Sequence, residues 1–379
     1  MNFLNQEQQF WLETAQRVMQ EEITREYVRE CDMERRYPYE AYEKVARLGW
    51  LRLLVPEENG GDGGNIFDYA LMCEGLGRYG FDFATAFMVS TFTAMNIVKF
   101  GTPEQQERFL PAFMNGEIRF SISISEPSAG SDAANTRTRA EKRDDHWVIT
   151  GQKLWCSGAA ARNTFIAMLV RTDRDALKHK GLSVLLVPND IEGLDVRRLP
   201  TLARRATGTT EIFADGAIVP ECNMLGSPGD GWRIITDHLE LERIAVAAAY
   251  VGNAQQAVSD ALQYAHDRIQ FEQKIFDFQV IRHMLADMQT AVDAARLMVY
   301  RAADMASRGI PCQREVSMAK LTASETLQTV TRNGMQILGG HSMLPDADME
   351  RYFREGMQST IGGGTSQIQR TLIAKSMNL

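Results

Sequence analysis

Cysteine pairs, nucleotide-binding motifs and long hydrophobic runs are all missing from this chain of 379 residues. Its five cysteines are scattered, odd in number and without a C-x-x-C pair, which is typical of reduced thiols in a cytosolic protein. The longest apolar runs, such as FIAML and VLLVP, are too short to cross a bilayer. The N-terminus has no basic start followed by an apolar block, so no signal peptide is expected. We therefore expect a cytoplasmic protein with no membrane span.

Several common catalytic motifs are missing as well. No G-x-G-x-x-G follows a strand-like segment, no phosphate-binding loop with its lysine occurs, and the six histidines form no H-E-x-x-H. These absences argue against a nicotinamide or ATP enzyme of the usual kind and against a metal hydrolase, and no metal site is predicted. The net charge of −8 argues against a general surface for nucleic acid or anionic membranes.

What is present is the composition of ordinary soluble domains, with 44% hydrophobic and 24% charged residues. Apolar residues recur at helical spacing in the first part of the chain, as at Ala15 and Val18. Short apolar runs between turn residues then indicate strands, and long helical patterns return after Trp232. We predict a mainly α fold with a β domain (α+β), divided into an N-terminal helical domain (1–118), a middle β domain (119–228) and a C-terminal helical domain (229–379).

The predicted elements are defined by their residue ranges. Strands are expected at RFSISIS (119–125), HWVITG (146–151), TFIAMLV (164–170), LSVLLV (182–187) and TEIFADGAIV (210–219). C-terminal helices are expected at 232–267, 277–308, 314–338 and 366–376. The stretch VPEENGGDGG (55–64) is expected to be a loop.

Three stretches could hold a ligand. In SISISEPSAGSD (121–132) a strand is expected to end at Glu126-Pro127, and the small residues that follow offer backbone N–H and hydroxyl groups at close range. In GQKLWCSGA (151–159), Trp155 stands two residues before Ser157, where it is either a core residue or the wall of a flat cofactor. In IGGGTSQIQR (361–370), three glycines let the backbone pass close to another group before a helix begins. For the first two, an ordinary strand, turn or core residue is the alternative.

Taken together, these motifs resemble the acyl-CoA dehydrogenase family. VPEENGG, SEPSAGSD, GQKLWCSGA, RIQFEQKIFDFQ, QILGG and GGGTSQIQR occur in the order and at the spacing of that family, over nearly the whole chain. The resemblance implies an N-terminal helical domain, a middle β-barrel-like domain and a C-terminal four-helix bundle, with FAD between the last two. It also implies a homotetramer, whose flavin site is completed by a neighbouring subunit, and electron transfer to an electron-transfer flavoprotein.

The resemblance also implies roles for particular residues. Ile124, Ser125 and Ser157 would contact the flavin ring, Trp155 would pack against it, and Ser131 would contact the pantetheine of CoA. The pyrophosphate and adenosine of FAD in the adjoining subunit would be bound by Arg268, Phe271, Gln279, Gln336, Gly339 and Gly340. Thr365 and Gln367 would meet the FAD diphosphate at the N-terminus of the last helix, where free N–H groups and the helix dipole favour anions.

The catalytic base is the point at which this chain departs from most of the family. There, a carboxylate takes the α proton of the acyl thioester, and it occupies the position that matches Gly363 here. The stretch DHLELERIAVAAAYVG (237–252) supplies Glu242, which on a helix shares a mostly apolar face with His238 and Ala245. Burial on that face would raise the pKa of the carboxyl group and suit it to act as a general base. A solvated ion pair is the alternative reading of Glu242.

A minority branch of the family, which includes isovaleryl- and long-chain-type enzymes, carries its base in this L-x-L-E-R position opposite a glycine. By that resemblance Glu242 is the base and Arg243 contacts the substrate, and Gly363 leaves room beside the thioester. Glu240 lies about 200° away around the helix and is the weaker candidate.

The acyl group is less well defined by the sequence. In the register of FATAFMVSTFTAMNIVKFG, Thr85, Met88 and Phe92 would line the acyl tunnel, with ordinary helix core as the alternative. Phe92 and Met88 would shorten the tunnel while the glycines widen it near the thioester, which suggests a short, branched or cyclic acyl chain. Two other functions stay open: a reductase or a dehydrogenase of carrier-protein-bound substrates on the same fold, and a catalytically silent binding module.

Overall fold

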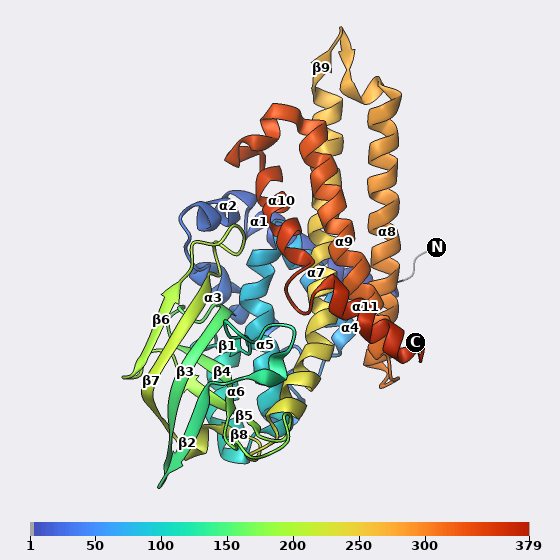
Figure 1. Ribbon diagram of the computed structural model, residues 1–379. Coiled ribbons are helices and arrows are strands. Elements are labelled where there is room, and N and C mark those ends of the chain that lie inside the picture. Colours follow the sequence, from blue (N-terminus) through green and yellow to red (C-terminus); the bar gives the residue numbers. More distant parts are fainter. Residues whose placement is uncertain (1–3, 379) are drawn as a thin grey trace. The chain divides into compact units, whose positions relative to one another are not determined.

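The computed structural model describes residues 4–378, which form two compact units. Within these residues, one unit comprises 4–33, Asn65–Ala84 and 243–378, and the other comprises Glu34–Gly64 and Thr85–Glu242. Figure 1 gives the order of the elements along the chain. The helices are α1 (Gln6–Glu21), α2 (Arg25–Met33), α3 (Tyr39–Arg47), α4 (Ile66–Gly77), α5 (Phe81–Phe100), α6 (Pro103–Met114), α7 (Gly231–Asp267), α8 (Gln279–Ser307), α9 (Gln313–Leu338), α10 (Met349–Ser359) and α11 (Ser366–Ser376).

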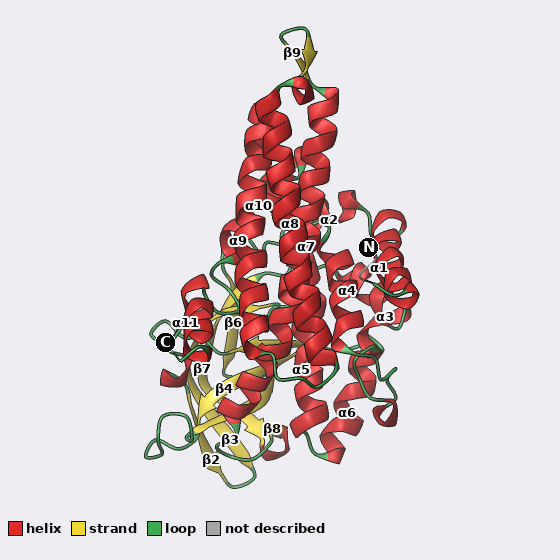
Figure 2. Ribbon diagram, turned by 90° about the vertical axis from the view of Figure 1, so that its right-hand side faces the viewer, coloured by secondary structure: helices red, strands yellow, loops and turns green. Residues whose placement is uncertain are grey.

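The strands, drawn in yellow in Figure 2, lie almost entirely in the second unit. They are β1 (Arg119–Ser123), β2 (Arg139–Arg143), β3 (His146–Ser157), β4 (Thr164–Arg171), β5 (Leu182–Pro188), β6 (Leu194–Arg198), β7 (Thr209–Pro220) and β8 (Met224–Leu225). Their order in the sheet is β6-β7-β3-β2-β4-β5-β8, and β1 pairs in parallel with β4. A short hairpin of β9 (Ile269–Gln270) and β10 (Gln273–Lys274) belongs to the first unit.

The sheet forms because apolar residues recur where one or both faces are covered. In β5 six of the seven residues are buried, which explains its continuous apolar sequence LSVLLVP. β3 and β7 alternate instead, and their inward residues, among them Ile149, Ile212 and Val219, join one buried cluster. This core fixes the register of β3, and therefore fixes the positions of Trp155 and Ser157 at its end.

Small residues allow the helices of the first unit to pack closely. A Cβ atom at Gly77 would lie 2.3 Å from the carbonyl oxygen of Ala249, and one at Gly252 would lie 1.9 Å from that of Glu74. Since no side chain fits at either position, α4 and α7 cross with their backbones in contact. Glu74 accepts hydrogen bonds from Arg296 (2.9 Å) and Tyr300 (2.9 Å) of α8, which ties α8 to the same crossing.

One helix, α5, is long and apolar enough to cross a membrane by length and composition, although its sequence contains no long uninterrupted apolar run. Most of its residues are buried inside the protein, including Phe87 and Phe92. It is therefore a core helix, which needs an apolar surface on nearly all sides for the same reason that a membrane helix does.

The structure confirms the mainly α architecture with a sheet between helical segments, and it corrects several predicted elements. β1 ends at Ser123, so Glu126 lies in a bridge with Ala129 and not at the end of a strand. The predicted strand 146–151 and the motif 151–159 are parts of one strand, β3. The prediction omitted α10, because its core side includes charged residues such as Arg354, which is buried in an ion pair with Asp32. β2 and β6 were also not predicted.

Candidate functional site

The SEPSAGSD loop is held by a buried ion pair. Nζ of Lys153 lies 3.0 Å from Oε1 of Glu126, and both side chains are almost fully buried. Lys153 also donates to the carbonyl of Ile124 (3.1 Å), while the Glu126 carboxylate accepts from the backbone N–H groups of Arg137 (2.8 Å) and Thr138 (2.9 Å). Burial lowers the pKa of the Lys153 ammonium to about 8, although the Glu126 carboxylate favours its charged form. The pair fixes the backbone that leads into this loop.

The predicted serines stand at the surface of this arrangement. Ser125 is half-buried, and its carbonyl accepts from the N–H of Leu154 (2.9 Å), which brings the segment after β1 against the end of β3. Ser157 is also half-buried, and its carbonyl accepts from Ser121 (2.7 Å). Ser131 is exposed, next to an ion pair between Asp132 and Lys178 (2.6 Å). Both half-buried serines thus have their carbonyls bound within the protein.

Trp155 has an unusual backbone for a large residue. Its φ is +65°, in the left-handed region, and it falls at a register shift between β3 and β7. Its side chain is 58% exposed, so the ring is not part of the core. A bulky residue in this conformation costs on the order of 1–3 kcal/mol and persists where the surroundings require it, commonly at binding sites. The bulge directs a flat aromatic surface outward beside Ser157.

A second strained aromatic residue lies in the first unit. The hairpin β9–β10, which extends beyond the ends of α7 and α8 in Figures 1 and 2, turns through Phe271 and Glu272. Their φ values are +52° and +65°, a conformation for which Asn-Gly is the usual sequence. Phe271 is 88% exposed, and Arg268 and Gln279 on either side of the hairpin are exposed as well. These three predicted residues therefore gather at one end of the helical unit.

The QILGG motif ends α9. Gln336 and both glycines are exposed, and Gly339 has φ +58°. A Cβ atom at Gly339 or Gly340 would meet no atom within 4 Å, so space for a ligand is open above this backbone. The glycine at 339 is required by its backbone conformation, since its φ and ψ of 58° and −138° suit glycine alone.

The glycine loop has its carbonyls bound from three sides. Nε of Arg243 donates to the carbonyl of Gly363 (3.1 Å), and Nζ of the fully buried Lys320 donates to that of Gly364 (2.9 Å). The amide of Gln369 donates to both carbonyls, at 3.2 Å each. Gly363 and Gly364 have φ values of +65° and +90°. Arg243, which we predicted to contact the substrate, thus anchors the loop.

The helix predicted to follow this loop is confirmed. Thr365 is the N-cap of α11, and its hydroxyl accepts from the N–H of Ile368 (3.1 Å). Gln367 is exposed in the first turn. The N-terminus therefore offers backbone donors to an anion, as expected from the helix dipole.

Glu242 lies on α7, next to a buried histidine of the same unit. Oε2 of Glu242 is 3.4 Å from Nε2 of His238, and the Glu242 side chain is 20% exposed. Nδ1 of His238 is 2.8 Å from the amide nitrogen of Asn96 on α5. An amide nitrogen donates only, so Nδ1 accepts from Asn96, and Nε2 faces Glu242. This carboxylate is mostly shielded from water and has a fixed polar neighbour.

The three predicted tunnel residues, Thr85, Met88 and Phe92, are all buried on α5. The ring centroid of Phe92 is 6.0 Å from that of His238, so this stripe reaches the residue that contacts Glu242. The predicted residues thus fall into two groups. One unit contains Thr85, Met88, Phe92, Ile124, Ser125, Ser131, Trp155, Ser157 and Glu242, and the other contains Arg243, Arg268, Phe271, Gln279, Gln336, Gly339, Gly340, Gly363, Thr365 and Gln367.

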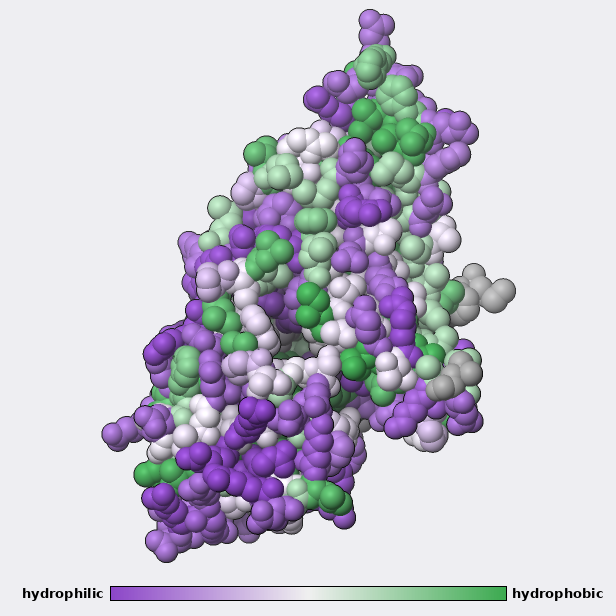
Figure 3. Space-filling model, in the orientation of Figure 1, coloured by the Kyte–Doolittle hydropathy of each residue, from purple (hydrophilic) through white to green (hydrophobic). Residues whose placement is uncertain are grey.

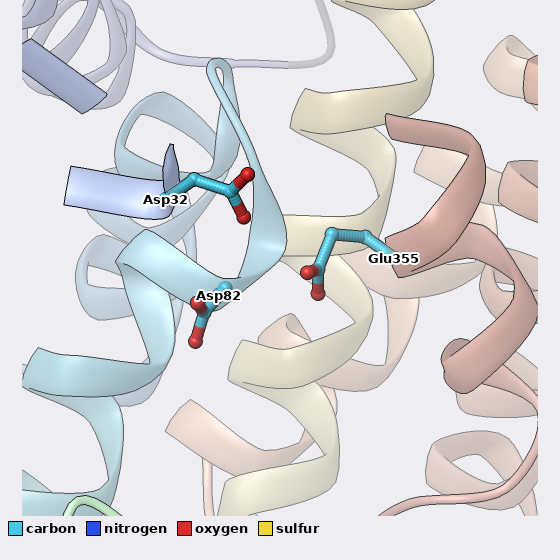
Figure 4. A group of neighbouring side chains, drawn as sticks. All are labelled: Asp32, Asp82 and Glu355. Carbon is cyan, nitrogen blue, oxygen red and sulfur yellow. The ribbon is translucent and has the colours of Figure 1, made fainter. Parts of the chain in front are cut away.

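The side chains that hold these groups in place were not predicted from the sequence. Lys153, Lys320 and Asn96 act through contacts between residues far apart in the chain, and no spacing rule reveals them. Three buried carboxylates that were also not predicted, Asp32, Asp82 and Glu355, form a cluster, shown in Figure 4. Arg354 forms an ion pair with Asp32 (2.6 Å), and Asp82 lies in the first turn of α5, where the helix dipole favours a carboxylate. We interpret this cluster as structural.

Comparison with family models identifies all three parts of the chain. Residues 5–117 match the acyl-CoA dehydrogenase N-terminal domain, residues 121–217 the middle domain and residues 229–378 the C-terminal domain. Two relatives are similar over most of their length. A probable acyl-CoA dehydrogenase, YngJ of Bacillus subtilis, is 35% identical, with both chains covered in full. The mitochondrial short-chain specific acyl-CoA dehydrogenase of Bos taurus is 34% identical over 91% of this chain and 84% of its own.

Solved structures agree with this assignment. Butyryl-CoA dehydrogenase from Megasphaera elsdenii superposes with a TM-score of 0.93 at 29% identity, covering both chains in full. The prolyl acyl carrier protein oxidase AnaB has a TM-score of 0.93 at 26% identity, covering 99% of this chain and all of its own. By its matched domains, its relatives and its fold, the chain belongs to the acyl-CoA dehydrogenase family of FAD-dependent oxidoreductases.

Proposed function

We propose that this enzyme is an acyl-CoA dehydrogenase that introduces an α,β double bond into a short, branched or cyclic acyl thioester, with Glu242 as its base. The observation that carries the proposal is the environment of Glu242, four-fifths buried and 3.4 Å from a fully buried histidine. The loop position at which most of the family keeps a carboxylate is Gly363 in this chain. Electrons would leave to an electron-transfer flavoprotein.

The residues that are present fit FAD. Trp155 and Phe271, both predicted flavin-site residues, are aromatic, exposed and strained, with φ values of +65° and +52°. Gly339 and Gly340 leave open space above their backbone, and α11 offers its N-terminus to a diphosphate. Arg268 carries a planar guanidinium that matches phosphate oxygens in pairs. We assign Arg268, Phe271, Gln279 and Gln336 to the FAD of an adjoining subunit in a homotetramer.

The domain limits 1–118, 119–228 and 229–379 belong to the same proposal. In it, the strained Trp155 packs on the flavin ring while Ile124, Ser125 and Ser157 contact its polar edge. Ser131 meets the pantetheine of CoA. Thr365 and Gln367 meet the diphosphate.

In the proposed reaction, the carboxylate of Glu242 takes the α proton of the thioester. When bound, FAD supplies the acceptor at N5 for the β hydrogen, which leaves as hydride. Glu242 is suited to its part because its side chain is four-fifths buried, and its carboxylate lies 3.4 Å from Nε2 of the buried His238. Arg243 and Lys320 donate to carbonyls of the glycine loop and so fix its backbone. Because the loop residues are glycines, no side chain would occupy the space beside the thioester.

A second function has one observation in its favour. The similar structure of AnaB is described as a prolyl acyl carrier protein oxidase, so the fold also accepts substrates bound to a carrier protein. The two alternatives differ in the group to which the pantetheine arm of the substrate is attached: the nucleotide of CoA in one case and a small carrier protein in the other.

The purified holoenzyme tests both. It is mixed anaerobically with a panel of acyl-CoAs, and with the same acyl groups on a carrier protein, and loss of the oxidised flavin absorbance is followed. We expect short and branched acyl-CoAs to reduce the flavin with a higher kcat/KM than palmitoyl-CoA. Reduction by carrier-bound groups alone would replace the CoA assignment, and a preference for long straight chains would show that Met88 and Phe92 do not shorten the tunnel.

A further inference from the structure

Another large side chain with a left-handed backbone lies near the proposed acyl site. Arg204 is in the loop between β6 and β7, and its φ is +60°. An arginine gains nothing intrinsically from this conformation, which costs an L-residue about 1–2 kcal/mol relative to the right-handed region. Such strain is maintained by the surrounding structure, and it directs the side chain to a particular place.

The loop around Arg204 is fixed by its own hydrogen bonds. Nη2 of Arg198 donates to the carbonyls of Arg205 (2.7 Å) and Ala206 (3.2 Å). The N–H of Gly208 donates to the carbonyl of Arg204 (3.0 Å), and the hydroxyl of Thr201 donates to that of Ala203 (2.7 Å). The position of Arg204 is therefore set by its backbone.

The guanidinium of Arg204 reaches α5. Its Nη1 donates to the hydroxyl of Thr85, which is buried. Thr85, Met88, Phe92 and Asn96 follow one another at three- and four-residue steps and so lie along one face of the helix. Phe92 and Asn96 contact His238, the neighbour of Glu242. The stripe therefore has a cation at one end and the proposed base near the other, about 10 Å apart along the helix from Thr85 to Phe92.

We propose that Arg204 is a specificity-determining residue that selects acyl chains with a carboxylate at the end remote from the thioester. This inference rests on the proposed function, because it takes Thr85, Met88 and Phe92 as the lining of the acyl site. A carboxylate accepts two parallel hydrogen bonds from a guanidinium fork, and the hydroxyl of Thr85 can turn to donate to it as well. A methyl-terminated chain would instead place hydrocarbon against a partly desolvated charge, which is unfavourable.

A purely structural role for Arg204, as a link between its loop and α5, predicts a different result. In that case its removal weakens folding or FAD retention and lowers the activity on every substrate by the same factor. A selective role changes the ratio between substrates. The ratio of kcat/KM values for two chains of matched length, one ending in carboxylate and one in methyl, therefore separates the two roles.

The experiment uses the holoenzyme and three variants: Arg204→Met, which keeps the length but removes the charge, Arg204→Lys, which keeps the charge without the fork, and Thr85→Val, which keeps the guanidinium. Arg197→Met is the control, since Arg197 is an exposed arginine of β6 paired with Asp195. Glutaryl-CoA and adipoyl-CoA are each compared with the methyl-terminated acyl-CoA of matched length. Binding of the same ligands is measured by calorimetry, so that a change in turnover is not required.

We expect the wild-type enzyme and the Arg197→Met variant to prefer the carboxylate-terminated chains. Arg204→Met should reduce that preference roughly 10- to 100-fold in both kcat/KM and affinity, as for the loss of a charge-assisted hydrogen bond, and Arg204→Lys should recover part of it. Thr85→Val retains the guanidinium and should keep most of the preference. It provides a second measurement if Arg204→Met folds poorly. An unchanged ratio in Arg204→Met, or a wild-type preference for methyl-terminated chains, overturns this inference and leaves the proposed function standing. If no acyl-CoA of either kind reduces the flavin, the proposed function itself fails.

Discussion

Glu242 and Glu240 are two carboxylates two positions apart on α7, and they form a matched pair for a test at the scale of single residues. Glu242→Gln keeps the shape and hydrogen bonding of the side chain but cannot accept a proton. Since positioned general bases contribute roughly 10²- to 10⁴-fold in rate, flavin reduction by a good substrate should slow by that factor while FAD stays bound. Stopped-flow absorbance measures it, with Glu240→Gln as the control. Near-normal reduction in Glu242→Gln would make Glu242 a structural charge.

The glycine at 363 permits a second test of the same chemistry. On the Glu242→Gln background, Gly363→Glu should restore part of the lost rate, because the carboxylate then stands where most of the family carries it. A Cβ atom at 363 would have only Cε of Lys320 within 4 Å, at 3.8 Å, so there is room for the side chain. Recovery should be incomplete, since a φ of +65° strains any residue but glycine and a misplaced catalytic group costs on the order of 10²-fold. No recovery at all, with FAD still bound, would indicate that the two positions do not serve one α-carbon.

The motifs predicted which residues belong to the candidate site, but they did not predict the backbone conformations or the long-range contacts of those residues. The motifs identified Trp155 and Phe271 as site residues. Nothing in GQKLWCSGA or RIQFEQKIFDFQ predicts a left-handed backbone at an aromatic residue. That conformation follows from a bulge in β3 and from a two-residue turn, which depend on the partner strands. The role of Arg243 in holding Gly363 was also beyond reach, because 120 residues separate the two.

At the scale of elements, the buried pair Glu126–Lys153 links the SEPSAGSD loop to β3, and it makes an acid-sensitive contribution to stability. Burial opposes the charged form of Glu126, but the Lys153 charge and the N–H groups of Arg137 and Thr138 outweigh it, so its pKa lies below the ordinary value. A lowered carboxyl pKa means that the stabilisation is complete above the unfolded-state pKa, about 4.3, and is lost as the pH falls through the folded-state value.

Glu126→Gln should therefore lower the free energy of unfolding at neutral pH by about 3–5 kcal/mol, since it leaves the buried Lys153 without its counter-charge. Its stability should also fall less steeply than that of the wild type below about pH 4. Denaturant unfolding at several pH values measures both effects. Glu141→Gln, which removes an exposed carboxylate of β2, is the control and should change little. Parallel acid profiles for the wild type and Glu126→Gln would rule out this source of acid sensitivity.

Elements with a simple periodicity were predicted within one or two residues. β4, β5 and β7 are continuous or alternating apolar runs, and α7, α8 and α9 are long amphipathic or apolar helices. The missed elements have a small or partly polar buried side, and β2 buries a single residue, Ala140. β6 has no fully buried residue, and α10 buries Arg354 in an ion pair with Asp32, whose position only the fold reveals.

At the scale of the whole molecule, FAD retention and assembly should be coupled. Because Arg268, Phe271, Gln279 and Gln336 are exposed on the isolated chain, and are assigned to a neighbour's flavin, the purified protein should be a yellow oligomer with non-covalent FAD. Arg268→Ala combined with Gln336→Ala should release FAD and shift the assembly toward smaller species, because ligand binding stabilises the state that binds it. Analytical ultracentrifugation with detection at the flavin absorbance measures both. A colourless monomer that added FAD does not convert would contradict the assignment.

The hairpin β9–β10 has a consequence for a chain that has not yet formed the proposed oligomer. Ile269, Phe271 and Val280 are each more than half exposed at that end of the molecule, where Figure 3 shows green, hydrophobic surface. A newly made chain released into a crowded cell carries this apolar tip in contact with water, together with two exposed strand edges. In the proposed oligomer, flavin and a neighbouring subunit would cover this apolar tip, so the yield of soluble protein should depend on how quickly they bind to it.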